Sequence, residues 1–451
     1  MRSLIKKIVP AGVFHKVEPA GHKLEAVIEE VFYGFPAKNL KVIGVTGTDG
    51  KTSTCTLITA MLRHAGFKVA MMTTISVDYG DGIVHSNPTR LTSLGSLQLV
   101  RELKKIKAAG AEWLVLETTS HALAQYRVWG VPYTIGVMTN VGHEHLDYHG
   151  TFERYRDAKK MLFEHVNSNK NGLQVGVANA DDPSGELFAA SVKNPVLYGM
   201  KKGDLRAEDV TLTPSGSRYS AVIGNEKYRI TCHLPGSFNV YNSLAAVAVG
   251  RAVGLTASQI EQGIASLDSV EGRMTRVDEG QDFDVIVDYA HTPESFEKVF
   301  KEVKPLVQGK MIAVFGSAGR RDIEKRAKQG EMAGKYCDEV VVTEEDDRDN
   351  DGQEILEQIA SGAEKAGKVK EENLFLVHDR EDAIAFAFKR AQKGDMVLLL
   401  GKGHEKSILS NGPKAAEYRD RPQDDSDPER VIKRDYDEVS VARSILENWK
   451  H

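Results

Sequence analysis

The stretch Gly44-Val-Thr-Gly-Thr-Asp-Gly-Lys51-Thr52 decides the fold of the first half of the chain. It follows the apolar run Leu40-Lys-Val-Ile43 and precedes the helical pattern Ser53–Leu62. A strand, a glycine-rich turn and a helix in this order form a cradle for a triphosphate, because glycines let backbone N–H groups face phosphate oxygens. Lys51 can reach the outer phosphates, and the Thr52 hydroxyl can ligate Mg²⁺.

This turn departs from the strict P-loop pattern, which requires glycine at position 45, where the chain has Val45. We interpret it as a P-loop variant with the signature TGTxGKT. The plain alternative is an ordinary glycine-rich turn between a strand and a helix. Gly-Lys-Thr at the start of a helix argues against that alternative, because it would require several coincidences.

Composition places the chain among globular proteins of more than one domain. A length of 451 residues suits two or three domains, and 41% hydrophobic and 27% charged residues are ordinary for a soluble protein. The net charge of −5 shows no overall excess of positive charge that would attract nucleic acid, so no nucleic-acid partner is expected. Cys55, Cys232 and Cys337 form no CxxC motif, which fits a reducing cytoplasm. No apolar run approaches the roughly 18 residues that span a bilayer.

Strands alternate with helices in both halves of the chain, which predicts an α/β fold with largely parallel sheets. In the first half we expect strands at 41–45, 68–73, 113–116 and 133–139, helices at 52–65, 93–109 and 239–253, and short antiparallel segments around 212–232. In the second half we expect strands at 285–287, 311–315, 339–343 and 396–400, and helices at 293–303, 325–336, 379–391 and 437–449. The polar tail 411–434 is expected to be an exposed loop.

These patterns predict three parts. Residues 1–39 read as a short helical lead-in, because 22–33 has helical apolar spacing and Gly34-Phe-Pro36 ends it. Residues 40–270 form a central P-loop ATP-binding domain with a mostly parallel sheet. Residues 271–451 form a C-terminal, doubly wound, Rossmann-like domain.

Functional groups follow two of the expected strands, at the edge where the carboxyl ends of parallel strands meet. Glu117 ends one strand, and its carboxylate is a hard oxygen donor that suits Mg²⁺. His143, His145 and His149 follow another strand and raise zinc as an alternative, because imidazole suits zinc. A nucleotide site favours magnesium, and hydrogen bonding within the loop is a further alternative for His143 and His149.

Eight motifs in order then reveal a resemblance to the Mur ligase family, and within it to the MurE type, which adds the third amino acid to the muramoyl peptide. The matching motifs cover roughly residues 40–450 and are Thr46-Gly-Thr-Asp-Gly-Lys-Thr52, Glu117-Thr-Thr-Ser-His-Ala-Leu-Ala-Gln-Tyr-Arg127, Thr139-Asn-Val-Gly-His-Glu-His-Leu-Asp-Tyr-His-Gly150, Tyr155-Arg-Asp-Ala-Lys159, Gly236-Ser-Phe-Asn-Val-Tyr-Asn242, Glu271-Gly-Arg-Met274, Asp288-Tyr-Ala-His-Thr-Pro293 and Gly401-Lys-Gly-His-Glu405.

The resemblance implies an ATP- and Mg²⁺-dependent amide ligase. ATP would phosphorylate a substrate carboxylate, and an amine would then attack the acyl phosphate. The implied catalytic residues are Lys51, Glu117, His145 and Lys159, of which Lys159 would carry a carbamate and ligate metal with Thr52, Glu117 and His145. A helix-surface lysine is the plain alternative for Lys159. The implied ATP-binding residues are Gly47, Thr48, Asp49, Gly50, Lys51, Thr52, Ser53, Asn242, Asp288 and His291, although turn chemistry alone could explain 288–291.

Substrate contacts carry over in the same way. The muramoyl-peptide acceptor would contact Thr92, Ser93, Thr119, Ser120, Gln125 and Arg127, although the pair Thr92-Ser93 lacks the usual following proline. The incoming amino acid would contact Arg326, Asp346, Asp347, Arg348, Gly401 and Glu405.

Two departures from the family pattern bear on specificity. Members that use meso-diaminopimelate carry Asp-Asn-Pro-Arg, where this chain has Glu345-Asp-Asp-Arg348. Arg348 suits a distal carboxylate, whereas the acidic run 344–347 suits a cationic substrate such as lysine or forms a solvated loop. The second departure is the short lead-in before the P-loop, which predicts that the uridine diphosphate handle is recognised differently, supplied by a partner chain, or absent.

Two rival functions remain open at the sequence level. A folylpolyglutamate synthetase-like ligase also lacks the uridine-binding domain, but 271–274, 120–123 and 401–405 are MurE-like. A non-catalytic, ATP-binding Mur-like subunit is the other rival, and the intact Lys51, Glu117, His145 and Lys159 argue against it.

Overall fold

The computed structural model describes residues 11–74, 76–86, 95–419, 421 and 423–449. The chain divides into two compact units, which are described separately. Unit 1 comprises residues 1–211, 217–233 and 237–268, and unit 2 comprises residues 212–216, 234–236 and 269–451. Among the described residues, no helix is long and apolar enough to cross a bilayer.

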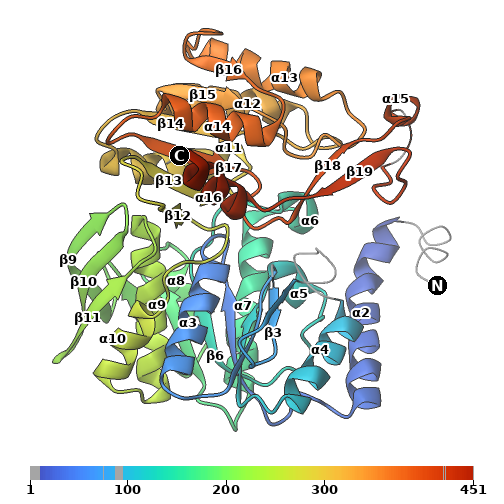
Figure 1. The fold of residues 1–451 in the computed structure, drawn as a ribbon. Coiled ribbons are helices and arrows are strands. Elements are labelled where there is room, and N and C mark those ends of the chain that lie inside the picture. The colour runs from blue at the N-terminus through green and yellow to red at the C-terminus, as the bar shows by residue number, and fades with distance from the viewer. Residues whose placement is uncertain (1–10, 75, 87–94, 420, 422, 450–451) are drawn as a thin grey trace. The chain divides into compact units, whose positions relative to one another are not determined.

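Unit 1 is built on an eleven-stranded sheet with the order β11-β10-β9-β8-β7-β6-β1-β5-β2-β3-β4 (Figure 1). In this order, every neighbouring pair from β9 through β1 to β2 is parallel. Antiparallel strands lie at the two edges, β10 and β11 at one and β3 and β4 at the other. The strands are β1 (Lys41–Thr46), β2 (Val69–Met72), β3 (Ser76–Asp78), β4 (Val84–Ser86), β5 (Trp113–Glu117), β6 (Tyr133–Met138), β7 (Val175–Asn179), β8 (Asn194–Gly199), β9 (Leu205–Thr213), β10 (Gly216–Ile223) and β11 (Glu226–Cys232).

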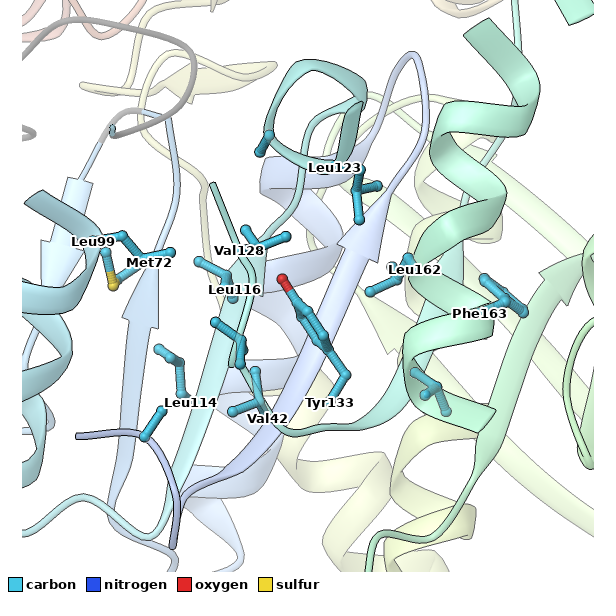
Figure 2. Packing of buried hydrophobic residues seen from close by; sticks show 14 of the residues in the cluster. Val42, Met72, Leu99, Leu114, Leu116, Leu123, Val128, Tyr133, Leu162 and Phe163 are labelled. Atoms are coloured by element: carbon cyan, nitrogen blue, oxygen red, sulfur yellow. The ribbon is translucent and has the colours of Figure 1, made fainter. Parts of the chain in front are cut away.

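The helices of unit 1 cover this sheet and connect its strands. They are α2 (Ala11–Tyr33), α3 (Lys51–His64), α4 (Ser96–Ala108), α5 (Ser120–Ala124), α6 (Leu146–His149), α7 (Phe152–Ser168), α8 (Gly185–Ala189), α9 (Ser237–Val253) and α10 (Ala257–Ala265). The core consists of strand residues packed against α4, α5 and α7, as Figure 2 shows for Val42, Leu114, Tyr133, Leu162 and Phe163. Because β1 and β5 pair in parallel, the helices that follow them, α3 and α5, begin at the same edge of the sheet.

Unit 2 contains a six-stranded sheet with the order β12-β13-β17-β14-β15-β16 and a two-stranded sheet of β18 and β19. The larger sheet is parallel except for β12. Its elements are β12 (Thr275–Val277), β13 (Asp284–Asp288), α11 (Pro293–Val303), a 3₁₀ turn (Lys304–Leu306), β14 (Met311–Phe315), α12 (Glu324–Tyr336), β15 (Glu339–Val342), α13 (Gly352–Lys365), β16 (Leu374–Leu376), α14 (Arg380–Arg390), β17 (Met396–Leu400), β18 (Ser407–Asn411), α15 (Ala415–Tyr418), β19 (Val431–Asp435) and α16 (Glu438–Trp449).

The structure confirms the α/β fold class, with one large, mostly parallel sheet in each unit. It corrects one prediction, because the tail 411–434 is not simply an exposed loop. β19 pairs antiparallel with β18 in this tail, and the Arg430 side chain is buried. Arg430 forms an ion pair with the buried Asp349, so its charge is neutralised by a residue about 80 positions earlier, which local sequence patterns cannot reveal.

Candidate active site

The loop between β1 and α3 is held in place by the end of β6. Thr48 N donates to Asn140 O at 2.9 Å, and Asp49 N donates to Asn140 Oδ1 at 3.0 Å. Thr139 Oγ1 donates to Asp49 O at 2.6 Å. These bonds with the two residues that directly follow β6 fix the loop, so its backbone is preorganised.

Two glycines in this loop are required by its conformation. Gly50 has φ +79°, and a Cβ there would lie 2.4 Å from Asn242 Oδ1. Gly47 has φ +152°, and a Cβ there would lie 1.8 Å from Thr139 Oγ1. The predicted ATP-binding residue Asn242 therefore lies against the loop, and Thr54 Oγ1 donates to its Oδ1 at 3.2 Å.

Two lysines from separate helices meet at the loop. Lys51 Nζ donates to Gly47 O at 3.1 Å and to Thr48 O at 2.7 Å, and Lys159 Nζ donates to Gly47 O at 2.6 Å. Lys159 is only 2% exposed, whereas its neighbour Lys160 is partly exposed and pairs with Glu164 at 2.6 Å. The helix-surface alternative for Lys159 is therefore wrong.

Burial, reinforced by the nearby Lys51 charge, holds the pKa of the Lys159 ammonium well below its usual range. The Lys159 Nζ also lies 4.4 Å from the centre of the Tyr155 ring. A lowered pKa favours the neutral amine over the ammonium, and the neutral amine is the form that can react with carbon dioxide.

Oxygen donors lie at the start of α3. Thr52 Oγ1 donates to Glu117 Oε2 at 2.9 Å, although the two residues are 65 positions apart. Thr74 N donates to the same oxygen at 3.3 Å. A hydroxyl and a carboxylate in contact beside a phosphate-binding loop form the donor set that Mg²⁺ prefers, so these residues fit that ion.

A cluster of rings lies next to these groups. The His121 ring lies 4.8 Å from that of His145 and 4.4 Å from that of Tyr148, and the His145 ring lies 6.0 Å from that of Tyr155. His145 has φ +54°, a left-handed conformation that is costly for histidine. His121 and Tyr155 were not predicted as site residues, although both lie within quoted motifs, because ring contacts between separate segments leave no sequence signal.

His143 and His149, the other two histidines of the zinc alternative, contact different residues. His149 is buried, and its Nε2 lies 3.1 Å from Ser120 Oγ in α5, so its partner lies outside its own loop. The His143 ring stacks on Phe152 at 4.7 Å. In the part of the chain that the structure describes, His143, His145 and His149 do not converge as a metal-binding group.

The predicted acceptor residues gather around the short helix α5. Thr119 caps this helix by accepting a hydrogen bond from Ala122 N at 3.2 Å, and Gln125 Nε2 donates to Tyr148 OH at 3.0 Å. Ser120 contacts His149, and Arg127 follows the helix. Thr92 and Ser93 lie outside the described residues.

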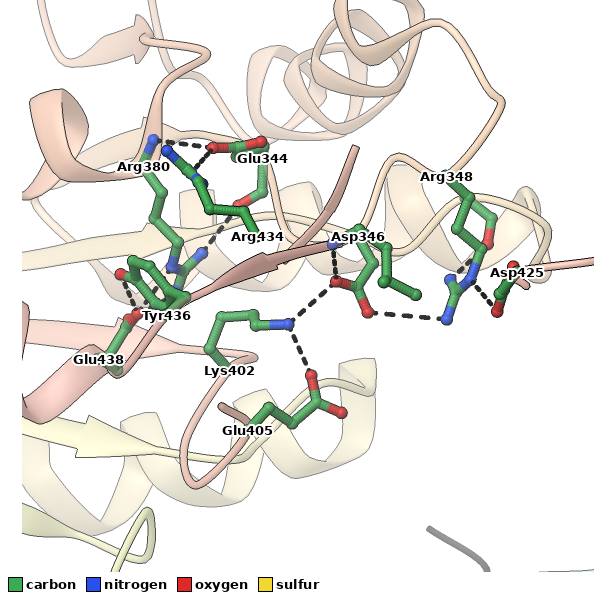
Figure 3. Close-up of polar contacts among 12 residues, drawn as sticks. Glu344, Asp346, Arg348, Arg380, Lys402, Glu405, Asp425, Arg434, Tyr436 and Glu438 are labelled. Carbon is green, nitrogen blue, oxygen red and sulfur yellow. Dashed lines mark hydrogen bonds and ion pairs between the residues drawn. The ribbon is translucent and has the colours of Figure 1, made fainter. Parts of the chain in front are cut away.

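In unit 2, the acidic stretch before Arg348 is buried, so the solvated-loop alternative is wrong. Arg348 Nη1 donates to Gly319 O at 2.9 Å, and its Nε donates to Asp425 Oδ2 at 3.2 Å (Figure 3). Its Nη2 lies 3.6 Å from Asp346 Oδ2. The guanidinium that was expected to bind a distal carboxylate thus already contacts two carboxylates of the chain.

Asp346 and Glu405 share a buried lysine. Lys402 Nζ donates to Asp346 Oδ1 at 3.1 Å and to Glu405 Oε2 at 2.7 Å, and the Lys402 side chain is 0% exposed (Figure 3). Lys402 was not predicted as a site residue, although it belongs to the quoted motif 401–405. Two of the predicted amino-acid contacts therefore lie together.

Asp347 has a different partner. Its Oδ2 lies 2.7 Å from His378 Nε2, and these two residues form with Glu344 a group of potential metal ligands. Arg434 Nη2 donates to Glu344 Oε1 at 2.6 Å, so the charge of Glu344 is already balanced. Asp347 and Glu344 therefore belong to ion pairs of the chain itself.

Several polar atoms near these residues are buried without a hydrogen-bond partner. Arg326 is 2% exposed, and its Nη1 donates to Gln358 Oε1 at 2.7 Å while its Nε has no partner. Burial raises the pKa of Glu345 to about 7, its Oε2 has no partner, and a Cβ at Gly401 would lie 3.0 Å from that atom. Unsatisfied buried atoms are costly, so they favour a polar ligand.

The end of β13 holds the last two predicted nucleotide contacts. Asp288 Oδ2 accepts from Met274 N and its Oδ1 accepts from Ala290 N, both at 2.8 Å, which is turn chemistry. Burial and the nearby Lys325 lower the pKa of His291 to about 4, so the imidazole is neutral at pH 7. Contact of either residue with a nucleotide stays a prediction.

Comparisons with known proteins identify the family of the chain. Residues 45–250 match the Mur ligase middle domain, and residues 272–403 match the Mur ligase, glutamate ligase domain. The UDP-N-acetylmuramyl-tripeptide synthetase of Roseiflexus sp. (strain RS-1) is 42% identical over 396 residues, which are 85% of this chain and 78% of that protein. The chain belongs to the Mur ligase family.

Further relatives point to the same family. The UDP-N-acetylmuramoyl-L-alanyl-D-glutamate–2,6-diaminopimelate ligase of Geobacillus thermodenitrificans (strain NG80-2) is 39% identical over 86% of this chain and 79% of that protein. A solved ligase of the same name has a TM-score of 0.67 at 28% identity and covers 96% of this chain and 83% of that one.

A Mycobacterium tuberculosis folylpolyglutamate synthase shares the fold, with a TM-score of 0.66 at 14% identity over 85% of this chain and 92% of its own. Mur ligases are ATP-dependent, ADP-forming enzymes that make an amide bond, and this chain is an enzyme of that class with MurE-like sequence.

Proposed function

We propose that this Mur ligase adds a diamino acid, meso-diaminopimelate or lysine, to a muramoyl-dipeptide acceptor in the cytoplasm. The names of the relatives support this reaction, since they include tripeptide synthetases and diaminopimelate ligases. The observation that carries the proposal is the meeting of Lys51, Lys159 and the Thr52–Glu117 pair at one loop. We also propose the domain bounds 40–270 and 271–451.

The loop 47–53 would bind the ATP phosphates through its backbone N–H groups, the dipole of α3 and the Lys51 ammonium. Thr52, Glu117, His145 and a carbamylated Lys159 would hold Mg²⁺. When bound, that ion neutralises charge on the phosphates during transfer. Asn242 lies against the loop and would contact the nucleotide, and we propose Asp288 and His291 as further nucleotide contacts.

The first chemical step requires two anions, the acceptor carboxylate and the γ-phosphate, to approach each other. Lys51 offsets this repulsion and stabilises charge on the transferred group. Thr119, Ser120, Gln125 and Arg127 would orient the acceptor so that its carboxylate meets the phosphate in line. The product of this step is an acyl phosphate, and ADP leaves.

The second step is attack by the amine of the incoming amino acid on the acyl phosphate, with release of inorganic phosphate. Arg326, Asp346, Asp347, Arg348, Gly401 and Glu405 would bind that amino acid. The unpartnered atoms of Arg326 and Glu345 support a zwitterionic ligand, because one offers a donor and the other an acceptor. Neither the described residues nor the relatives' names indicate a partner chain for the acceptor's handle.

A phosphate-release assay tests the proposal. The enzyme, ATP and Mg²⁺ are combined with a muramoyl dipeptide and, in turn, meso-diaminopimelate, lysine or no amine, and product mass is read by mass spectrometry. We expect a tripeptide product with one of the two diamino acids. A separate arm offers a folate and glutamate, and product only in that arm would replace the MurE-type proposal with the folylpolyglutamate alternative.

A further inference from the structure

Two buried arginines of unit 2 hold consecutive residues of one loop. Arg326 Nη2 donates to Ala318 O at 3.3 Å, and Arg348 Nη1 donates to Gly319 O at 2.9 Å. Both side chains are buried. A buried guanidinium requires an anion to neutralise it, so the other partners of each arginine decide how many substrate carboxylates can bind here.

The hydrogen-bond acceptors of Arg326 are neutral. Its Nη1 donates to Gln358 Oε1 at 2.7 Å, its Nη2 donates to the backbone carbonyl of Ala318, and its Nε has no partner. A substrate carboxylate at this guanidinium would supply both the missing acceptor and the missing negative charge. Arg326 therefore suits the carboxylate that every amino acid carries.

The charge of Arg348, in contrast, is neutralised by the chain itself. Its Nε donates to Asp425 Oδ2 at 3.2 Å, and its Nη2 lies 3.6 Å from Asp346 Oδ2 (Figure 3). Gln423 Nε2 donates to the same Asp425 oxygen at 2.8 Å and helps to hold it. A second substrate carboxylate would meet two carboxylates around this one cation, and like charges at this distance repel. Of the two arginines, Arg326 alone is therefore ready to bind a substrate carboxylate.

Glu345, three residues before Arg348, supplies a buried carboxylate whose Oε2 has no hydrogen-bond partner. Two lysines lie near it, but neither neutralises it. Lys402 pairs with Asp346 and Glu405, and Lys325 forms no ion pair with Glu345 in the part of the chain that the structure describes. A buried carboxylate without a cation favours a ligand that brings an ammonium.

We propose that the incoming amino acid has two amines and a single carboxylate, as lysine and ornithine do, and that Asp425 excludes a distal carboxylate by holding Arg348. The carboxylate of the substrate pairs with Arg326, and its side-chain ammonium pairs with Glu345. Meso-diaminopimelate, which carries a second carboxylate, is then a poor substrate. This inference rests on the proposed ligase function and names its substrate class.

A panel of amino acids tests the substrate class on the unmutated chain. Tripeptide formation from a muramoyl dipeptide, ATP and Mg²⁺ is measured with lysine, ornithine, meso-diaminopimelate and norleucine, which matches the carbon chain of lysine without its ammonium. We expect lysine or ornithine to have the highest kcat/KM, and the values for meso-diaminopimelate and norleucine to be at least about tenfold lower, because each mismatches one charged contact.

The failures of the two proposals differ in this assay. A kcat/KM for meso-diaminopimelate that equals or exceeds those of lysine and ornithine would overturn the inference and leave the proposed ligation standing. Equal use of norleucine and lysine would overturn the pairing of an ammonium with Glu345. No tripeptide from any of the three diamino acids would overturn the proposed function, and the inference with it.

Asp425→Asn tests the excluding residue, and Asp424→Asn at the exposed neighbouring carboxylate is the matched control. Asp425→Asn should raise kcat/KM for meso-diaminopimelate about tenfold and change that for lysine by less than about twofold, because it frees Arg348 and leaves Arg326 and Glu345 unchanged. Asp424→Asn should change neither value. No rise for meso-diaminopimelate in Asp425→Asn would overturn the role of Asp425.

Discussion

At the scale of single residues, Lys159 and Lys160 differ in burial and in the groups that they contact. They are adjacent in the chain, yet Lys159 is buried against Gly47 O and Tyr155 while Lys160 pairs with Glu164. Their sequence context is the same, so only the resemblance separates them before the structure is seen. Burial then gives the physical reason, since desolvation favours the neutral amine.

We predict that Lys159 carries a carbamate in the active enzyme. The neutral amine adds to carbon dioxide and releases a proton, which converts a cation beside the phosphate loop into an anion. ¹³C-bicarbonate should give a carbamate signal in ¹³C NMR, and Lys159→Met should lose both the signal and most ligase activity. Lys160→Met is the control and should keep both. A signal that survives in Lys159→Met would contradict the assignment.

Glu345 gives a prediction about pH. Burial raises its pKa from 4.5 to about 7 in the folded chain, against the opposing charges of Lys325 and Lys402, while Asp346 and Glu405 raise it further. The unfolded chain therefore loses this proton near pH 4.5 and the folded chain near pH 7. Stability from this group is full below pH 4.5 and falls as pH rises to 7, by up to about 3 kcal/mol.

Glu345→Gln removes the free-energy cost of burying a charged carboxylate and keeps the shape of the side chain. We expect the variant to melt at a higher temperature than the unmutated chain at pH 8 and at nearly the same temperature at pH 4.5, in thermal unfolding followed by circular dichroism. Glu372→Gln, at an exposed carboxyl, should change neither melting temperature. A Glu345→Gln variant that is less stable than the unmutated chain at pH 8 would refute the claim that the charged Glu345 carboxylate destabilises the fold.

At the scale of elements, the sequence predicts what repeats locally and misses what depends on distant partners. The strand at 41–45 and the helix at 293–303 were confirmed as β1 and α11, because buried strands and amphipathic helices leave periodic patterns. Helices α7 and α13 were not predicted. The pairing of β18 with β19 was not predicted and the tail was expected to be an exposed loop, because its Arg430 and Arg434 pair with Asp349 and Glu344, which lie far away in the sequence.

In the candidate site, too, some contacts could be predicted from the sequence and others could not. The motif residues Lys51, Thr52 and Glu117 do meet at one loop, since parallel strands bring their carboxyl ends together. The engagement of Arg348 with Asp425 could not be predicted, because 77 residues separate the two and no local pattern links them.

The ion pair between Arg348 and Asp425 gives a prediction about amino-acid choice. Asp425 is 33% exposed at the side chain, and it would compete with a substrate carboxylate if Arg348 binds one. Asp425→Asn should therefore raise kcat/KM for meso-diaminopimelate relative to lysine by about tenfold, since charge-assisted hydrogen bonds contribute about 1.5–3 kcal/mol. Arg348→Ala should lower that ratio, with ATP binding unchanged. Equal effects on both amino acids would exclude Arg348 as the selecting residue.

At the scale of the whole molecule, the two α/β units carry different sets of polar groups. Unit 1 holds the phosphate loop, the Thr52–Glu117 pair and the buried lysine, whereas unit 2 holds the buried charge network around Arg348 and Lys402. We propose that the first set activates the acceptor carboxylate and that the second binds the incoming amino acid. The central claim of this proposal is that turnover depends on the phosphate loop of unit 1.

The most direct test is the rate of ATP-dependent tripeptide formation by the Lys51→Ala variant, measured by product mass beside ADP release. Removing a charge that stabilises the transferred phosphoryl group should lower kcat by about 10²- to 10³-fold. Lys107→Ala, at an exposed lysine of α4, is the control and should retain the unmutated rate. Near-normal tripeptide formation by Lys51→Ala, with an intact circular dichroism spectrum, would contradict the account.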